Sequence, residues 1–251
     1  GKRALYKSEL MMLEMLANTN WERPMYMAIT VASENHLNMG DNFMQEGLAY
    51  RITPFNTTKL NARVDSEKMY DNLMHKFKFG GIDKDDIYLD ETILRMAQTH
   101  RRMFVQVASQ LIKEGKNEKA LKALDYCQQV IPSKNVAHDY VMSSSKEMAD
   151  DYIALGEYAK AEAILDELGN KAVEYITWYM SLDDERLALS YDNCIRNFYI
   201  LDEINKSLER ITALKTGQPE GEMTVSSEME EHYAKKFNEL YDMFNVRVGR
   251  K

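Results

Sequence analysis

The sequence predicts a mostly α-helical fold, an array of helical hairpins stacked as an α-α superhelix, with a small two-stranded α/β cap at the N-terminal end. The main observation is a pattern that occurs twice, as Gly115-x4-Ala120-x3-Leu124 and as Gly156-x4-Ala161-x3-Leu165. This spacing is typical of tetratricopeptide-like hairpins, in which a glycine takes the turn conformation and a small residue lets paired helices approach closely. The chain has 251 residues, which is enough to bury a sizeable core without disulfide bonds.

Two segments near the N-terminus are rich in β-branched and aromatic residues, and these predict the strands of the cap. A helical pattern of apolar residues over 8–17 comes first, and the strand-forming segments follow at 25–31 and 47–53. A polar connection lies between the two segments. A helix that begins at Asp65 or Ser66 completes the cap.

The chain is predicted to divide into two domains where the pattern changes. Residues 1–82 form the cap, and residues 83–251 form the helical array, which begins with an acidic loop over 83–91. That loop invites interpretation as a calcium site, but Ile87 and Tyr88 stand where an EF-hand needs a liganding residue and a glycine. We therefore expect its carboxylates to provide favourable charge at the start of the next helix.

The array is expected to end with a long helix and a capping helix. Apolar residues at helical spacing run over 187–211, and Gly217 ends that helix. A loop over 216–222, which contains a proline and two glycines, is the predicted linker. Ser227 and Glu230 form a capping box for the last helix, which we expect to cover the open end of the stack.

Charge and apolar content exclude several classes of partner. The formal net charge of −8 argues against nucleic acid and anionic membranes, because both need a basic surface. The run His100-Arg101-Arg102 lies within a helical pattern, where we expect a solvated face. Cys127 and Cys194 occupy apolar helical positions, where a cysteine behaves as a small hydrophobic residue. No apolar run reaches the roughly 18 residues of a membrane span.

No catalytic, cofactor or metal site is predicted. The sequence contains no phosphate-binding glycine loop, no His-Glu-x-x-His zinc motif and no serine hydrolase motif. Its five histidines do not fall at the spacing of metal ligands. Carboxylate pairs such as Asp183-Asp184 are explained by favourable charge at a helix N-terminus. We therefore expect that this chain is not itself an enzyme.

Hairpin arrays of this class usually bind peptides on the concave face formed by the first helix of each hairpin. Basic side chains there suit an acidic or carboxylate-bearing segment, and aliphatic ones accept its apolar side chains. In the alternative interpretation, later helices or the 216–222 loop fill this groove. Chaperone-tail clamps use asparagines at the positions of Ser109 and Asp150, so that partner is not expected. The predicted peptide-binding residues are Arg102, Val105, Ser109, Ile112, Lys113, Lys146, Asp150 and Ile153, with Ser143 on the same face.

Several phrases of the sequence resemble a bacterial family of large multi-pass membrane proteins. In that family an N-terminal membrane region is similar to class C glycosyltransferases of the protein O-mannosyltransferase type, and a soluble portion with tetratricopeptide-like helices follows. The resemblance spans nearly the whole chain. The matching phrases are Asn20-Trp21-Glu22-Arg23-Pro24-Met25-Tyr26, Glu46-Gly47-Leu48-Ala49-Tyr50-Arg51, Met69-Tyr70-Asp71-Asn72, Lys76-Phe77 and Tyr88-Leu89-Asp90-Glu91.

The resemblance implies that this chain is the soluble portion of such a protein. The parent would lie in the bacterial inner membrane with this portion in the periplasm, and its catalytic acids would belong to the membrane region. No catalytic residue can therefore be assigned here. Trp21, Arg23 and Pro24 form either a functional surface at the membrane-side end or a structural link between the first helix and the first strand.

Three hypotheses about function follow. The leading one is a non-catalytic interaction domain of a membrane glycosyltransferase-like protein that holds an acceptor polypeptide or a protein partner. The alternative is a free-standing tetratricopeptide-type scaffold that binds peptides, and the third is an enzyme in its own right. We expect a protein or peptide partner, no cofactor and no nucleic acid, with a membrane reached only through a region outside this chain.

Overall fold

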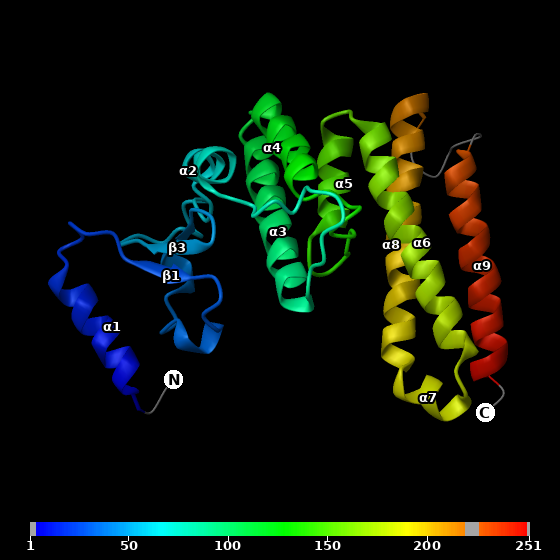
Figure 1. The fold of residues 1–251 in the computed structure, drawn as a ribbon, viewed down its shortest axis with the longest axis horizontal. Helices are drawn as coiled ribbons and strands as arrows, with labels where there is room; N and C mark the ends of the chain where they lie inside the picture. Colours follow the sequence, from blue (N-terminus) through cyan, green and yellow to red (C-terminus); the bar gives the residue numbers. More distant parts are fainter. Residues whose placement is uncertain (1–3, 219–225, 250–251) are drawn as a thin grey trace. The chain divides into compact units, whose positions relative to one another are not determined.

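The computed structural model describes residues 4–218 and 226–249, and it is mostly helical with a small antiparallel sheet near the N-terminus (Figure 1). The chain divides into two compact units. The first unit comprises Gly1–Asp86 with Gln106–Ile131, and the second comprises Ile87–Val105 with Pro132–Lys251. The predicted fold class is confirmed. The predicted domain division at residues 82 and 83 stays a prediction.

The sheet of the first unit has three strands, β1 (Tyr26–Ala28), β2 (Phe43–Gln45) and β3 (Ala49–Ile52), in the order β1-β3-β2. Both pairings are antiparallel. β1 and β3 lie inside the two segments predicted as strands. β2 was not predicted, and it makes this a three-stranded sheet. Helix α1 (Lys7–Asn18) precedes the sheet, and two short 3₁₀ turns, Ser33–Asn35 and Gly40–Asn42, lie between β1 and β2.

The two faces of this sheet differ in polarity. On one face Met27, Phe43 and Ile52 are buried together, and Met12 and Leu16 of α1 are among the side chains that pack against them. Residues opposite each other on neighbouring antiparallel strands project to the same face. The register places Arg51 opposite both Tyr26 of β1 and Met44 of β2, so these three side chains share the other face.

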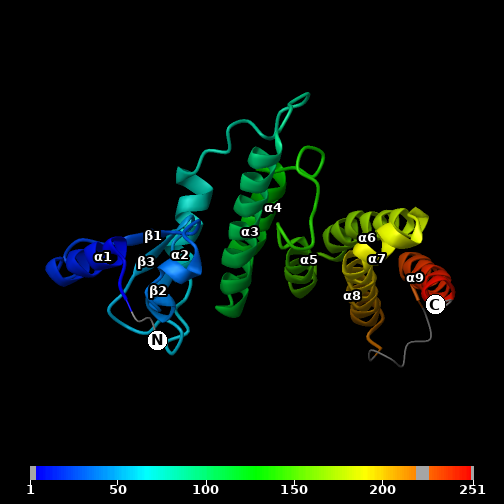
Figure 2. The ribbon, with the colours of Figure 1, turned by 90° about the horizontal axis from the view of Figure 1, so that it is seen from below.

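Helices complete the first unit. α2 (Ser66–Asp71) is capped by Asp65, as predicted, and continues into the π-helical segment Asn72–Lys76. The last part of α3 (Glu91–Lys113) pairs with α4 (Asn117–Val130), and the two lie side by side (Figures 1 and 2). Gly115 joins them with φ of 73°, a left-handed conformation that favours glycine.

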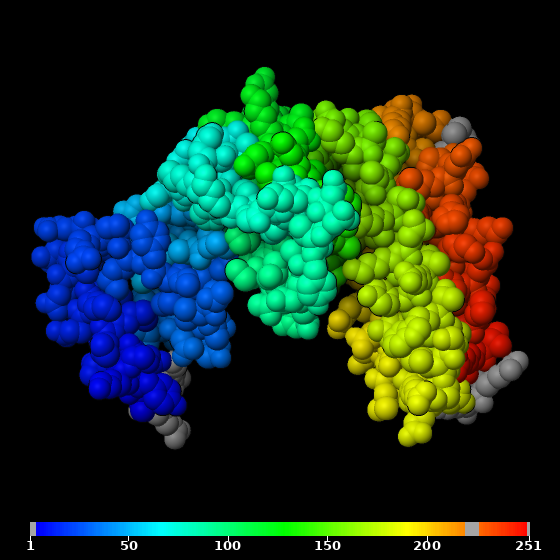
Figure 3. All heavy atoms as spheres, viewed as in Figure 1, coloured from blue at the N-terminus to red at the C-terminus, as the bar shows by residue number. Residues whose placement is uncertain are grey.

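The second unit contains α5 (Ser145–Ala154), α6 (Tyr158–Ser181), α7 (Asp184–Leu189), α8 (Tyr191–Thr216) and α9 (Glu228–Val248). α6, α8 and α9 lie side by side in Figures 1 and 2, and α6 and α9 share a continuous outer surface in Figure 3. Gly156, with φ of 79°, turns the chain between α5 and α6. The described helices include none that is long and apolar enough to cross a membrane.

The C-terminal predictions are largely confirmed. Ser227 and Glu230 form the predicted capping box of α9. The prediction of one long helix over 187–211 is wrong at its N-terminal end, because the helix is interrupted at Ser190, between α7 and α8. Gly217 ends α8, as expected. Residues 219–222 of the predicted linker lie outside the described residues.

A buried polar cluster in the second unit contradicts one prediction from the sequence. Arg101, expected on a solvated face, is 0% exposed, because its guanidinium donates hydrogen bonds to the carbonyl oxygens of Val136 (2.6 Å) and Ala137 (3.1 Å). His138 is 2% exposed, and its Nδ1 lies 2.8 Å from Ser145 Oγ. Burial lowers the pKa of His138 to about 3, with help from the positive charges of Arg101 and Lys171. His138 is therefore neutral in the fold.

The small residues at the hairpin contacts generate a stability prediction. Ala120 and Ala161 are both 0% exposed. Ala120→Leu or Ala161→Leu should lower the free energy of unfolding by about 1–3 kcal/mol, because extra methylenes overpack a filled contact. Ala163→Leu is the matched control, since Ala163 is exposed on α6. Urea unfolding of all three variants tests this, and an equal response of buried and exposed sites would contradict it.

The buried histidine generates a pH prediction. An unfolded histidine binds a proton near pH 6.5, whereas His138 in the fold does so only near pH 3, so stability falls as the pH decreases between these values. We expect a loss of about 2 kcal/mol between about pH 6.5 and about pH 5. Urea unfolding at several pH values should show this loss of stability in the wild type. His75→Gln is the control and should show the same loss, because His75 is exposed in the fold. His138→Gln should not show it, and an unchanged slope would refute the assignment.

Candidate functional site

A pocket of about 280 Å³ opens in the sheet region of the first unit. Its walls come from the turn that follows α1, from the middle of β2, and from the end of β3 with the residues after it. Most of the lining side chains are apolar, and two are arginines. They are Trp21, Arg23, Pro24, Met44, Arg51, Ile52, Thr53, Pro54 and Phe55.

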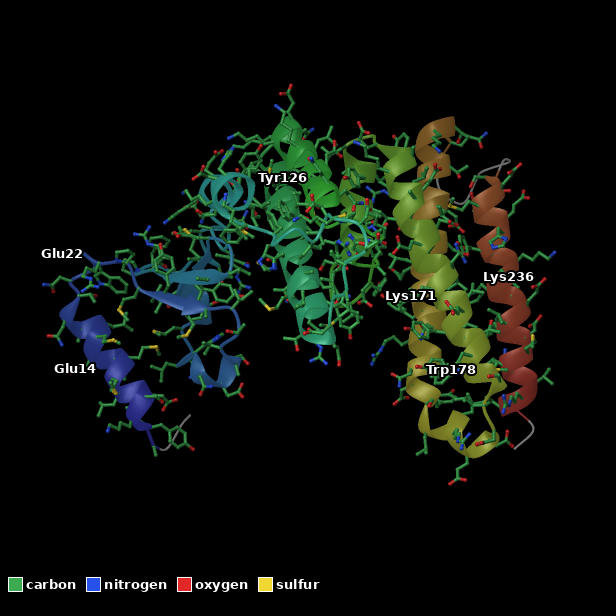
Figure 4. All side chains as sticks on the ribbon, in the orientation of Figure 1. Glu14, Glu22, Tyr126, Lys171, Trp178 and Lys236 are labelled. Atoms are coloured by element: carbon green, nitrogen blue, oxygen red, sulfur yellow. The ribbon has the colours of Figure 1, made fainter. Side chains whose placement is uncertain are left out.

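The turn after α1 brings a tryptophan to the rim in an uncommon conformation. Asn20 and Trp21 have φ values of 47° and 62°, both in the left-handed region that bulky residues rarely adopt. Such backbone costs roughly 1–3 kcal/mol for each residue and clusters at ligand sites. The Trp21 side chain remains 48% exposed, and Figure 4 labels its neighbour Glu22 on the same turn.

Arg51 occupies the polar face of β3, and its charge is only partly compensated. Its side chain is 44% exposed, and its Nη1 lies 3.7 Å from Glu46 Oε1, which is beyond hydrogen-bond distance. The Glu46 carboxylate makes much shorter contacts elsewhere. Glu46 Oε2 lies 2.5 Å from Lys68 Nζ and accepts a hydrogen bond of 2.7 Å from the Tyr26 hydroxyl.

Glu46 is the buried centre of this region, with 4% exposure. Its backbone oxygen accepts a hydrogen bond of 2.7 Å from Asn72 Nδ2, and Lys68 Nζ donates to the Tyr26 hydroxyl at 3.1 Å. The hydrogen bond to Glu46 raises the pKa of Lys68 in spite of its partial burial. Side chains from β1 and α2 thus converge on the Glu46 carboxylate, and a side chain from the segment after α2 holds its backbone.

Gly47, which follows Glu46 between β2 and β3, requires glycine for two reasons. Its φ is 131°, and a Cβ built there would lie 3.0 Å from the Phe77 ring. The backbone conformation and the aromatic ring beside it therefore leave no place for a larger residue at this position.

The peptide-binding residues predicted from the sequence are divided between the two units. Ser109, Ile112 and Lys113 lie in the first, and the other five lie in the second. Val105 and Ile153 are 3% and 2% exposed, so they pack in the core and do not line an open groove.

Lys146 Nζ lies 2.8 Å from Asp150 Oδ2, which neutralises its charge. Arg102 is half-buried, and a role of this set in peptide binding stays a prediction.

Sequence reasoning named Trp21, Arg23 and Pro24 as a possible surface but missed Arg51 and Phe55 as their neighbours. The sequence does contain an indication for Arg51, because this residue lies in one of the stretches that resemble the family. Its position against Met44 depends on β2, a strand that was not predicted. Cys127 and Cys194 are both buried, in agreement with their predicted apolar positions. Among the described residues, no cluster of His, Cys, Asp and Glu is placed to hold a metal ion.

Part of the chain matches a known family model. Residues 1–69 match a family model described as TMEM260-associated domain 2. No curated protein and no solved structure matches the chain. All the residues that line the pocket lie within the matched segment, together with Glu46 and Lys68. The match suggests a TMEM260-like family and a domain of a larger protein.

The Glu46 cluster generates a prediction about stability. Lys68→Met leaves a buried carboxylate without its closest cation, so it should lower the free energy of unfolding at pH 7 by about 2 kcal/mol. Adding Glu46→Gln should recover part of the stability, because a neutral amide needs no counterion. Urea unfolding of the single and double variants measures the coupling, and strictly additive losses would contradict the proposed pair.

Proposed function

We propose that this chain is a non-catalytic interaction domain of a membrane glycosyltransferase-like protein, and that it holds an acceptor polypeptide or a protein partner outside the membrane, on the periplasmic side of the parent. The match to TMEM260-associated domain 2 and the resemblance of the quoted phrases support this setting. The observation that carries the proposal is the pocket between the turn after α1 and the end of β3.

The pocket suits a side chain or two of an extended polypeptide. Its volume of about 280 Å³ is just below the range of about 300–1,000 Å³ that is usual for sites of small-molecule ligands. Trp21 and Phe55 present exposed aromatic surface at its rim. Aromatic side chains and arginines provide much of the affinity at protein interfaces.

The alternative is a tetratricopeptide-type scaffold that binds peptides along its hairpins. The repeated left-handed glycines at Gly115 and Gly156, each between two helices, favour it. In that case the exposed Lys113 at the end of α3 would contact the ligand.

Site-specific photocrosslinking distinguishes the two. A benzoylphenylalanine replaces Phe55 in the pocket, Lys113 on the hairpin, or Leu189, an 84% exposed control on α7. Each purified variant is irradiated with a pool of random ten-residue peptides. We expect capture at Phe55 well above that at Leu189. Capture only at Lys113 would favour the alternative, and equal yields at all three positions would contradict both.

A further inference from the structure

The charges of the pocket point to the chemistry of its ligand. Arg23 and Arg51 both line it, and no acidic side chain does. Within the described part of the chain, Arg23 has no ion pair, and the one acid near Arg51 is Glu46 at 3.7 Å. That acid is already neutralised by Lys68 at 2.5 Å. The pocket is therefore locally positive in a chain whose net charge is −8.

The side chains of the lining offer mainly hydrogen-bond donors. The Thr53 hydroxyl is engaged within the chain, because Thr53 Oγ1 lies 2.9 Å from the carbonyl oxygen of Asn42 and 2.8 Å from that of Phe55, and its single hydrogen is shared between them. The carbonyl oxygens of Thr53 and Phe55 accept hydrogen bonds from Asn42 Nδ2 at 3.2 Å and 3.0 Å. The remaining polar groups of the lining side chains are two guanidiniums and one indole N–H, which only donate.

The lining of the pocket fits a ligand that has a group which only accepts hydrogen bonds, with an apolar group beside it. A carboxylate accepts paired hydrogen bonds from a guanidinium, whereas a sugar hydroxyl needs acceptors as well as donors. The prolines, Met44, Phe55 and the Trp21 ring offer apolar contact beside the arginines. A free inorganic anion would leave this apolar surface uncovered.

We infer that the pocket recognises an acidic polypeptide segment, in which an aspartate or glutamate carboxylate pairs with Arg23 and Arg51 and a neighbouring apolar side chain packs on Trp21 and Phe55. This inference rests on the proposed function, and it specifies which polypeptide the domain holds. Trp21 serves both as a contact and as a reporter of binding.

The chain offers a direct optical measurement, because it has two tryptophans and the other, Trp178, lies on α6 in the second unit (Figure 4). In a Trp178→Phe background, Trp21 is the only indole. The probe is a blocked ten-residue peptide of alternating glutamate and leucine, compared with glutamine–leucine and lysine–leucine peptides. We expect a saturable change of Trp21 fluorescence with the glutamate peptide, and binding about tenfold weaker or worse with the other two.

Arginine variants test the assignment of the carboxylate partners. Arg23→Gln should weaken binding of the glutamate peptide about tenfold. It is the cleaner variant, since Arg23 is exposed, whereas Arg51→Gln also removes a neighbour of buried Glu46. Arg196→Gln makes the same change of net charge at an exposed site on α8 and should leave binding unchanged. Far-UV circular dichroism confirms that each variant is folded.

The outcomes separate this inference from the proposed function. Equal binding of the glutamate and glutamine peptides, or wild-type binding by Arg23→Gln, overturns the acidic-segment inference while polypeptide holding stands. An equal loss in Arg196→Gln overturns it as well, because general charge would then explain the effect. Displacement by inorganic phosphate at lower concentration than by the glutamate peptide would assign the pocket to a phosphorylated ligand. If no peptide alters Trp21 fluorescence and Phe55 captures none by crosslinking, both proposals fall.

Discussion

The first unit depends on one buried carboxylate. A charged group with 4% exposure must be paired, because the free energy of removing it from water is otherwise prohibitive. Glu46 meets this requirement with partners from two other elements, Tyr26 of β1 and Lys68 of α2. Asn72 adds a hydrogen bond to its backbone oxygen. The strands are only three or four residues long, so this cluster supplies fixed geometry that so small a sheet does not provide by itself.

The same constraint shapes the candidate site. Since Lys68 and Tyr26 occupy Glu46 Oε2, Arg51 is left with the longer contact to Oε1 and with a large exposed fraction. The Glu46–Lys68 pair, which stabilises the fold, therefore lies beside Arg51, which is available to a ligand. Because Arg51 lies beside Glu46, the effects of an Arg51 substitution on ligand binding must be separated from its effects on stability. Arg23, on the turn after α1, contributes to the pocket without that coupling.

The parts of the fold that could be predicted are those set by nearby residues. Asp65 caps α2, Ser227 and Glu230 form their capping box, and Gly115 turns the chain as its spacing predicted. β2 could not be predicted, because a segment of three residues carries too little periodicity to be recognised as a strand. The burial of Arg101 could not be predicted for a different reason, since its acceptors lie 35 and 36 residues away. The pocket depends on the β2–β3 register, so it could not be predicted from the sequence either.

The exposure of the polar groups in each unit distinguishes those that stabilise the fold from those that a ligand can reach. In the second unit, Arg101 donates to backbone carbonyls, and Tyr233 donates to Asp166 while its ring lies so close to Gly169 that a Cβ there would come within 2.5 Å. Those groups are enclosed, and no ligand can reach them without unfolding the packing around them. Arg23 and Arg51 differ because they are exposed on a largely apolar wall. The exposed guanidiniums of Arg23 and Arg51 are thus the groups that can gain contacts from an acidic partner, whereas Arg101 and Tyr233 already have their stabilising contacts within the fold.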